Sequence, residues 1–333
     1  MSAFDDRKAL YEQIEKERGS RVVTYITGDR PGMETQVSPE IVDLFVEHLD
    51  EIWPVTKISL ILHTNGGDTA AAWRLINLLR TFCDDLEVIV PSKALSAGTL
   101  ICLGADRIIM TKQATLGPID PSLNSPLGPI VPGSPSGHRA PVSVEAVQGF
   151  LDVATTELSI KDDAALAQIW NSLAAQIHPL VLGQIFRSRQ QIRSLARRLL
   201  AFQHVDMDVA DKIVSFLCSE SGSHDHTVNR REALELGLKV EKPSADLYEI
   251  LRKLQLNIVE TLSLRSAFNP DVELAGQPSV EYRAPRALIE SLTYGSHQFL
   301  SEGRVDRVEV QGPMGLQVGF QDTRRFEGWR KEG

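Results

Sequence analysis

The chain has 333 residues, of which 42% are hydrophobic and 24% are charged, and its formal net charge is −9. This length allows one large domain with a substantial extension, and the composition is that of an ordinary globular protein. The acidic balance argues against a broadly basic, nucleic-acid-binding surface, although it leaves room for a local basic patch. We expect no transmembrane segment and no signal peptide, because no run approaches ~18 apolar residues and the charged N-terminal stretch lacks an apolar core.

The three cysteines, Cys83, Cys102 and Cys218, are far apart and show no CxxC spacing. This pattern indicates neither a disulfide framework nor a zinc site, and it fits a reducing cytosol. The stretch "HDH" at 224–226 offers two ligands but no obvious third. We therefore predict a cytoplasmic protein with no metal and no cofactor, and the absence of a GxGxxG fingerprint argues against a nicotinamide.

Apolar runs and helical periodicity alternate along the first third of the chain. A charged helix is expected over residues 1–20, and Ser38 with Pro39 is expected to open a second helix as N-cap and first helical residue. The predicted strands are 21–28, 57–63, 86–90 and 107–110, and further helices are expected over 70–80 and from Ser96 onward. This alternation predicts βαβ units and a mostly parallel sheet.

The rest of the chain is less uniform. Residues 117–141 are rich in Pro, Gly and Ser, which is typical of either a lid over a site or a plain linker. A mainly helical region follows, with a short helix that ends near Gly237. Residues 304–322 alternate around a Pro-Met-Gly turn and predict a β-hairpin.

Two turns carry the chemistry. In "HTNGGD" a strand ends at His63 and the pair Gly66-Gly67 follows, and in "SKALSAG" Ser96 opens a helix after a strand. Ligands bind beyond the carboxyl ends of parallel strands, where both turns are expected. A hydroxyl at a helix start lies beside free amides, so the amide of Ala97 and that of Gly66 or Gly67 can hold an oxyanion. The alternative is that Ser96 only caps its helix.

A family resemblance rests on three stretches in order: "HTNGGD", "SAGTLICLGADRIIM" and "ATLGPIDP". Together they resemble the serine dehydrogenase proteinase family, which is signal peptide peptidase A-like and part of the ClpP/crotonase superfamily. The likeness covers residues 57–123 and extends more weakly to about residue 240.

The resemblance implies an α/β fold with a repeated ββα spiral core, helical additions and a C-terminal hairpin. The implied division is an N-terminal helix (1–20), a ClpP/crotonase-like domain (21–240) and an extension (241–333). It also implies serine peptidase chemistry on peptides or unfolded proteins, with self-association into a homo-oligomer. On this interpretation Ser96 is the nucleophile, and Gly66, Gly67 and Ala97 form the oxyanion hole.

The general base departs from the family pattern. ClpP-type peptidases use a His, but the corresponding stretch "LGPIDPS" contains none. Peptidase-A-type relatives use a Lys farther along, and no Lys lies between Lys112 and Lys161. A buried, neutral Lys can activate a Ser hydroxyl. Lys161 is therefore the candidate base, although its place before Asp162-Asp163 favours a solvated helix start, and His138 occupies the expected stretch.

Two further residues are candidates for the edge of the site. His63 is either a structural, hydrogen-bonded histidine, which its position at a strand end favours, or a site residue. Asp120, in Ile-Asp-Pro, either forms a turn or orients a base.

Three functions follow from these patterns. The first is a serine endopeptidase acting through Ser96. The second is a pseudo-peptidase that keeps the fold as a peptide-binding or assembly scaffold, which the missing base motivates. The third is crotonase-like stabilisation of a thioester enolate, against which the lack of paired Glu residues argues.

Overall fold

A computed structural model describes residues 3–119, 122–123, 125–131, 134, 138–220, 226–312 and 315–332. The chain divides into two compact units. The first, here called the core unit, combines Met1–Leu116 with Val228–Gly333, and the second, the helical unit, is Gly117–Thr227. These bounds differ from the three consecutive segments expected from the sequence, because residues after 228 return to the sheet that the first third of the chain builds.

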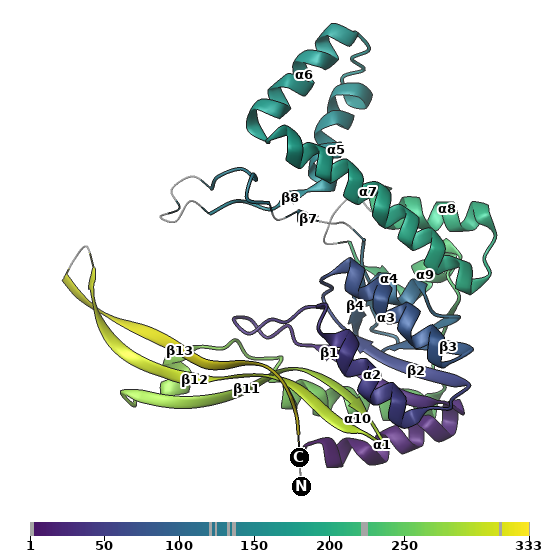
Figure 1. Cartoon of the computed structure of the whole chain (residues 1–333), viewed down its shortest axis with the longest axis vertical. Helices are drawn as coiled ribbons and strands as arrows, with labels where there is room; N and C mark the ends of the chain where they lie inside the picture. The colour runs from purple at the N-terminus through teal and green to yellow at the C-terminus, as the bar shows by residue number, and fades with distance from the viewer. Residues whose placement is uncertain are drawn as a thin grey trace. The chain divides into compact units, whose positions relative to one another are not determined.

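A large mixed sheet organises the core unit (Figure 1). Among the described residues it has eight strands in the order β10-β5-β3-β2-β1-β11-β12-β13. The parallel half consists of β1 (Arg21–Thr27), β2 (Lys57–His63), β3 (Asp85–Val90), β5 (Arg107–Met110) and β10 (Val240–Glu241). The antiparallel half consists of β11 (Ser279–Ser291), β12 (Gly295–Gly312) and β13 (Gly315–Lys331).

A second, smaller layer lies at the carboxyl ends of the parallel strands. It contains the three-stranded sheet β4-β6-β9 and two isolated bridges, Val37 with Gly67 and Thr64 with Ala94. Its strands are β4 (Lys93–Ala94), β6 (Thr115–Leu116) and β9 (Val228–Asn229). From this layer the chain enters a helix each time: α2 (Ile41–Ile52), α3 (Thr69–Phe82), α4 (Ala97–Leu103) and α9 (Arg230–Leu236). The predicted α/β class with a repeated strand–strand–helix core is confirmed.

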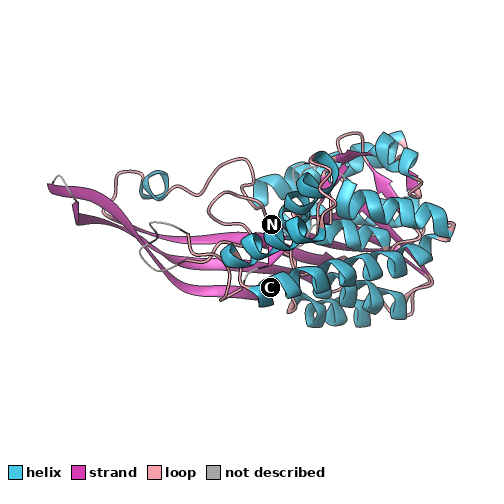
Figure 2. Cartoon of the chain, turned by 90° about the horizontal axis from the view of Figure 1, so that it is seen from above, coloured by secondary structure: helices cyan, strands magenta, loops and turns pink. Residues whose placement is uncertain are grey.

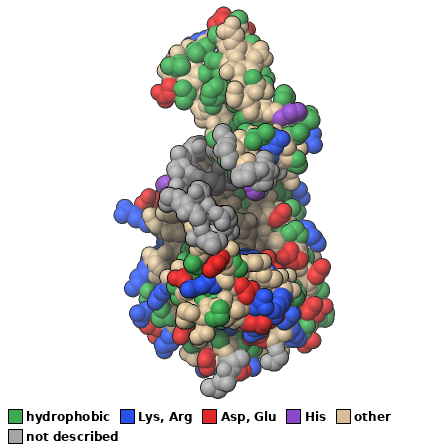
Figure 3. Space-filling model, turned by 90° about the vertical axis from the view of Figure 1, so that its left-hand side faces the viewer, with side chains coloured by type: hydrophobic (Ala, Val, Ile, Leu, Met, Phe, Trp, Pro, Cys, Tyr) green, Lys and Arg blue, Asp and Glu red, His purple; other side chains and the backbone are tan. Residues whose placement is uncertain are grey.

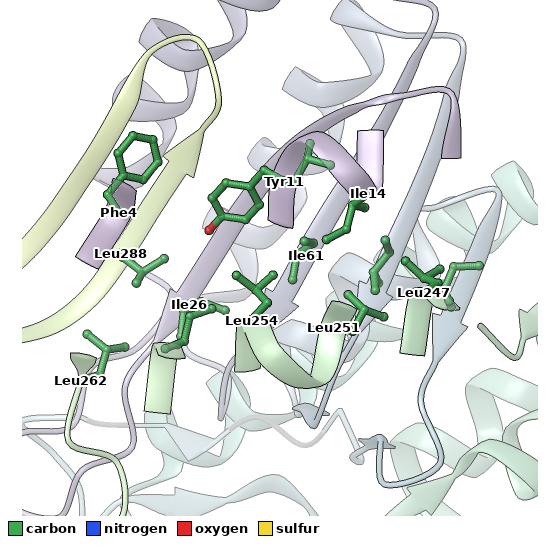
Figure 4. Close-up of a cluster of buried hydrophobic side chains, with 14 residues drawn as sticks. Phe4, Tyr11, Ile14, Ile26, Ile61, Leu247, Leu251, Leu254, Leu262 and Leu288 are labelled. Atoms are coloured by element: carbon green, nitrogen blue, oxygen red, sulfur yellow. The ribbon is translucent and has the colours of Figure 1, made fainter. Parts of the chain in front are cut away.

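The parallel strands are buried on both faces, as βαβ crossovers require. Even-numbered residues of β1 such as Val22 and Ile26 join a cluster with α1 (Ala3–Arg18) and α10 (Ala245–Thr261), drawn in Figure 4. The odd-numbered Tyr25 points the other way, and its ring lies 5.6 Å edge-on from Phe45 of α2. Strand alternation thus explains why helices cover both faces.

The helical unit is built from α5 (Val144–Asp152), α6 (Asp163–Gln176), α7 (Pro179–Leu200) and α8 (Met207–Ser215), with a two-stranded pairing of β7 (Ser122–Leu123) and β8 (Val142–Ser143). Three short helical turns complete it: Val153–Glu157, Ala201–Gln203 and Phe216–Glu220. Its apolar cluster joins Val144 and Val147 of α5 to Val181 and Ile185 of α7. Figure 1 labels these helices, and Figure 2 draws all described helices of the chain in cyan and the strands in magenta. Within the described ranges, no helix is long and apolar enough to cross a membrane.

Most elements fall where the sequence placed them. The predicted strand 57–63 coincides with β2, and the predicted hairpin lies within the longer pair β12 and β13. The expected helix cap at Ser38 is wrong, because α2 begins at Ile41 after Glu40 with no side-chain cap. The short helix α11 (Pro270–Leu274) and the strand β11 were not expected.

Candidate active site

Ser96 has a backbone conformation that a side chain rarely adopts. Its φ is 50° and its ψ is −113°, although it is not glycine. It occupies the cap position before α4, yet its hydroxyl makes no capping hydrogen bond. The interpretation of Ser96 as a simple side-chain cap is therefore wrong. Non-glycine residues in such regions cost about 1–3 kcal/mol and cluster at functional sites.

The Gly66-Gly67 turn lies directly against Ser96. A Cβ atom added to Gly66 would lie 2.7 Å from the Ser96 Cβ and 3.2 Å from the Ala97 nitrogen. Gly66 has a φ of +111° and Gly67 a φ of +142°, and a Cβ on Gly67 would lie 2.3 Å from the Val37 carbonyl oxygen. Both positions exclude a side chain, since the conformation and the close approach of backbone each require glycine.

Thr64 holds the two turns together. Its N–H donates to the Lys93 carbonyl at 3.1 Å, and its own carbonyl accepts from the Leu95 N–H at 3.0 Å. Its hydroxyl accepts from the Thr27 hydroxyl at 2.7 Å and from the Gly66 N–H at 2.9 Å. The strand-end bridge between β2 and β4 therefore fixes the position of Ser96 relative to the glycine pair.

Two backbone amides of these turns make no hydrogen bond among the described residues. The Gly66 N–H is already engaged by Thr64. The N–H groups of Gly67 and Ala97, in contrast, have no hydrogen-bond partner among the residues the structure describes. Ala97 is completely buried, and unpaired buried N–H groups are rare in proteins. Such a pair of amides can donate hydrogen bonds to a negatively charged oxygen.

A second group of polar side chains, Asp29, His63 and Lys93, lies at the same edge of the sheet. The Lys93 ammonium donates to the Asp29 carboxylate. His63 is 3% exposed, and its Nε2 lies 3.8 Å from Asp29 Oδ1, which is too long for a hydrogen bond. The His63 and Lys93 side chains hold the pKa of Asp29 well below its usual range, against the opposing effect of burial.

Neither ring nitrogen of His63 makes a hydrogen bond in the part of the chain that the structure describes, which differs from the hydrogen-bonded, structural histidine that its position favoured. A role at the edge of the site remains a prediction. Asp29 and Lys93 were not singled out from the sequence. The available signal was their position, since each follows the carboxyl end of a predicted parallel strand, where ligands bind.

The remaining candidates fall in the helical unit. Lys161 is exposed just before α6, and His138 is exposed as well. Asp120 lies outside the described residues. The catalytic role of Lys161 and the edge roles of His138 and Asp120 stay predictions.

Other reactive groups do not form a competing site in the described regions. Burial raises the pKa of the Cys83 thiol to about 11 and shifts that of Cys102 farther upward. Both cysteines are buried and neither is in a disulfide, so neither is a ready nucleophile. Within those regions no group of three or more His, Cys, Asp or Glu residues is arranged to hold a metal ion.

A strained serine at the start of a helix, beside unpaired amides on a layered α/β core, has the groups that acyl-transfer chemistry requires. The comparisons agree. Residues 44–133 match the model of the ClpP-like SDH-type serine proteinase family. This match confirms the family resemblance that the motifs indicated.

Two curated relatives, both from Methanocaldococcus jannaschii, match part of the chain. "Uncharacterized protein MJ0137" is 32% identical over 185 residues, which are 55% of this chain and 53% of that protein. "Uncharacterized protein MJ1495" is 34% identical over 124 residues, which are 35% of this chain and 42% of that protein. The chain thus spans about half the length of these relatives or less.

Solved structures show weaker similarity. A serine-to-alanine mutant of the 1510-N membrane-bound stomatin-specific protease has a TM-score of 0.39 and 18% identity, covering 70% of this chain and 85% of that one. An asparagine-to-aspartate mutant of ClpP1 from Listeria monocytogenes has a TM-score of 0.35 and 12% identity, covering 71% and 99%.

Proposed function

We propose that the protein is a serine peptidase that cleaves peptide bonds by acyl transfer through Ser96. The observation that carries this proposal is the uncapped, strained Ser96 held against the Gly66-Gly67 turn. The family match over residues 44–133 supports the same reaction class.

In the proposed reaction the Ser96 Oγ attacks the scissile carbonyl carbon, and its proton passes to a general base. The carbonyl oxygen becomes an oxyanion that accepts hydrogen bonds from the Gly67 and Ala97 amides. One such donor contributes about 3–4 kcal/mol of transition-state stabilisation in well-studied hydrolases. The C–N bond then breaks, the amine leaves with the proton, and water hydrolyses the acyl–Ser96 ester. Gly66 serves this site by its close approach, since its own N–H is occupied.

For the base we keep Lys161, with His138 as the other candidate. A lysine accepts a proton only when it is neutral, and neutrality requires shielding from water. Lys161 is exposed within its own unit, so the proposal requires bound substrate or a second copy of the chain to cover it. Extended peptides or unfolded proteins as substrates, a homo-oligomeric state and a cytoplasmic location belong to the same proposal.

The test is labelling of the full chain by a fluorophosphonate probe, followed by peptide mapping. We expect one adduct, on Ser96. Ser96→Ala should lose it, whereas Ser92→Ala, a change of the same kind four residues earlier, should keep it. Lys161→Ala should slow labelling markedly if Lys161 is the base, and His138→Ala should do so if His138 is.

The alternative is a scaffold that binds peptides without cleaving them. Absence of the Ser96 adduct in correctly folded, fully assembled protein would refute the peptidase and favour this scaffold. In that case Ser96→Ala should leave peptide binding unchanged.

A further inference from the structure

A cavity of about 570 Å³ in the core unit is lined by four basic side chains. They are Lys112, Arg230, Arg231 and Lys242, and the other lining residues are Asn229, Leu234 and Val240. Among the described residues that line it there is no Asp or Glu. This volume lies in the usual range for ligand sites.

Three separate segments bring these charges together. Val240 and Glu241 of β10 pair in parallel with Ile108 and Ile109 of β5, so Lys242 and Lys112 both follow the carboxyl ends of adjacent strands. Arg230 opens α9 and donates from Nη1 to the Met110 carbonyl at 3.1 Å, which fixes its guanidinium at the end of β5.

The Lys112 ammonium is also held in place. It lies 4.5 Å from the centre of the Tyr248 ring, and the Tyr248 hydroxyl donates to Gln113 at 3.4 Å. A cation over an aromatic face is attracted without being neutralised. Lys112 is therefore positioned but keeps its full charge.

The positive charges are poorly compensated. In the described part of the chain, Lys112, Arg230 and Lys242 have no carboxylate partner. Arg231 pairs with Glu235 at 2.9 Å, but their side chains are 89% and 63% exposed, so this pair contributes little. A cleft lined by one sign of charge concentrates ions of the opposite sign.

Elsewhere in the core unit, acidic and basic side chains are mixed. A larger cavity, of about 750 Å³, is lined by both signs of charge, including Glu12, Glu15, Lys16 and Lys57. Figure 3 shows acidic and basic side chains interspersed on the face of the core unit turned to the viewer. The cavity around Lys112 and Lys242 differs from these surfaces because all of its charged lining residues are basic, in a chain whose net charge is −9.

We propose that this cavity, the cationic pocket, binds an acidic peptide segment. Two observations favour carboxylates spread along a peptide over one compact anion. Asn229 Oδ1 already accepts from the Arg231 and Glu232 amides, so these amides are not free to cradle a phosphate. Leu234, which is 51% exposed, and Val240 add apolar surface for the aliphatic parts of a peptide.

The pocket also has a defined relation to Ser96. Asn229 pairs with Thr115 of β6, and Thr115 pairs with Lys93 of β4, three residues before Ser96. Two strand spacings separate Asn229 from Lys93, about 10 Å, which roughly three residues of extended peptide would span. Resting on the proposed function, the geometry assigns the pocket to acidic residues a few positions from the bond that Ser96 would cleave.

Peptide binding tests the pocket without turnover. We would use the full chain carrying Ser96→Ala and measure fluorescence anisotropy of a labelled extended decapeptide with four Glu residues, against the same peptide with four Gln. The Glu peptide should bind at least about tenfold more tightly and weaken as salt rises from 50 to 200 mM, since exposed charges are screened.

The matched variants remove two charges each. Lys112→Gln with Lys242→Gln should reduce affinity for the Glu peptide about tenfold. Lys8→Gln with Lys253→Gln, outside the pocket, should leave affinity unchanged. Circular dichroism and sedimentation velocity should match across all variants.

Equal binding of both peptides, or no loss in the pocket variant, would overturn the proposal. Inorganic phosphate that displaces the Glu peptide at equal molar concentration would assign the pocket to small anions instead. A changed oligomeric state in the pocket variant would make it an interface between copies. If the Glu peptide binds as expected but the fluorophosphonate probe fails on the unmutated chain, the pocket stands and the peptidase does not. If the probe labels Ser96 but the Glu peptide does not bind, the peptidase stands and the pocket does not.

Discussion

Acidification should destabilise the core unit through His48 of α2. His48 is completely buried, with Nδ1 2.7 Å from the Ser291 hydroxyl and Nε2 3.1 Å from His297 Nδ1. Burial, with smaller contributions from His297 and Lys331, lowers the pKa of His48 from 6.5 to about 3. Burial also lowers the pKa of His297, which Glu47 partly opposes from 3.6 Å. The folded protein therefore keeps His48 neutral.

The direction and size of the effect follow from proton linkage. An unfolded chain takes up a proton on His48 below pH 6.5, whereas the folded chain does not until about pH 3. This contribution to stability is complete above pH 6.5 and declines as the pH falls toward 3. At pH 5, which is 1.5 pH units below 6.5, the loss is about 2 kcal/mol at ~1.36 kcal/mol per unit.

Urea unfolding followed by tryptophan fluorescence measures this loss. Of the four tryptophans, Trp53, Trp73 and Trp329 lie in the core unit and Trp170 in the helical unit. A Trp170→Phe background therefore restricts the signal to the core unit. Between pH 7 and pH 5 the free energy of unfolding should fall by about 2 kcal/mol more in this background than with His48→Gln added.

The control is His204→Gln, which removes an exposed histidine and should leave the pH dependence intact. His48→Gln is expected to be less stable at pH 7, so the comparison rests on the change between the two pH values. Parallel losses with and without His48→Gln would refute the reasoning that His48 is held neutral.

Two further substitutions test the site and the core. Gly66→Ala should abolish fluorophosphonate labelling although Ser96 is still present, because its Cβ would lie 2.7 Å from that of Ser96; unchanged labelling with an intact fold would contradict this. Arg7→Leu should lower the free energy of unfolding by about 3–5 kcal/mol, because Arg7 and Glu290 form an ion pair with both side chains 0% exposed. The buried carboxylate would keep its hydrogen bonds from Tyr11 and Ser296 but lose its only cation among the described residues. Chemical denaturation measures the loss, and a loss below about 1 kcal/mol would show that the hydrogen bonds from Tyr11 and Ser296 suffice for the buried carboxylate.

Much of the first third of the chain was predictable because its signals are local. β2 is a continuous buried run bounded by polar residues, and α3 shows helical periodicity after the Asp68 cap. In a parallel sheet covered on both faces, each strand must be apolar throughout, so the pattern is strong. The order of strands and helices then restricts the topology.

The pairing of strands that lie far apart in the sequence could not be predicted from local patterns. β10 joins the sheet beside β5 after more than a hundred residues, and β11 pairs antiparallel with β1. Nothing within β10, which has only two residues, distinguishes it from a loop. The cap at Glu40 in place of Ser38 is a smaller case, since the bridge between Val37 and Gly67 decides where the chain can enter α2.

The conformation of Ser96 is the part of the site that sequence could not show, and it separates the two functional hypotheses. The N–H of Leu95, the residue before Ser96, donates a hydrogen bond to the Thr64 carbonyl. The N–H of Gly98, two residues after Ser96, donates to the Leu95 carbonyl at 2.8 Å. Gly98 also packs against Thr64, since a Cβ there would lie 2.5 Å from the Thr64 methyl carbon. The surroundings thus impose a φ of 50° at a cost of about 1–3 kcal/mol.

A peptide-binding scaffold would gain nothing from that cost, because glycine at position 96 would adopt the same φ without strain. A nucleophile does gain, because the Ser96 hydroxyl is not engaged as a helix cap and adjoins Ala97, whose N–H is unpaired among the described residues. Ser96→Gly therefore distinguishes the hypotheses by stability as well as activity. It should remove labelling while preserving or raising the free energy of unfolding, and a clear destabilisation would mean that the Ser96 side chain has a structural role after all.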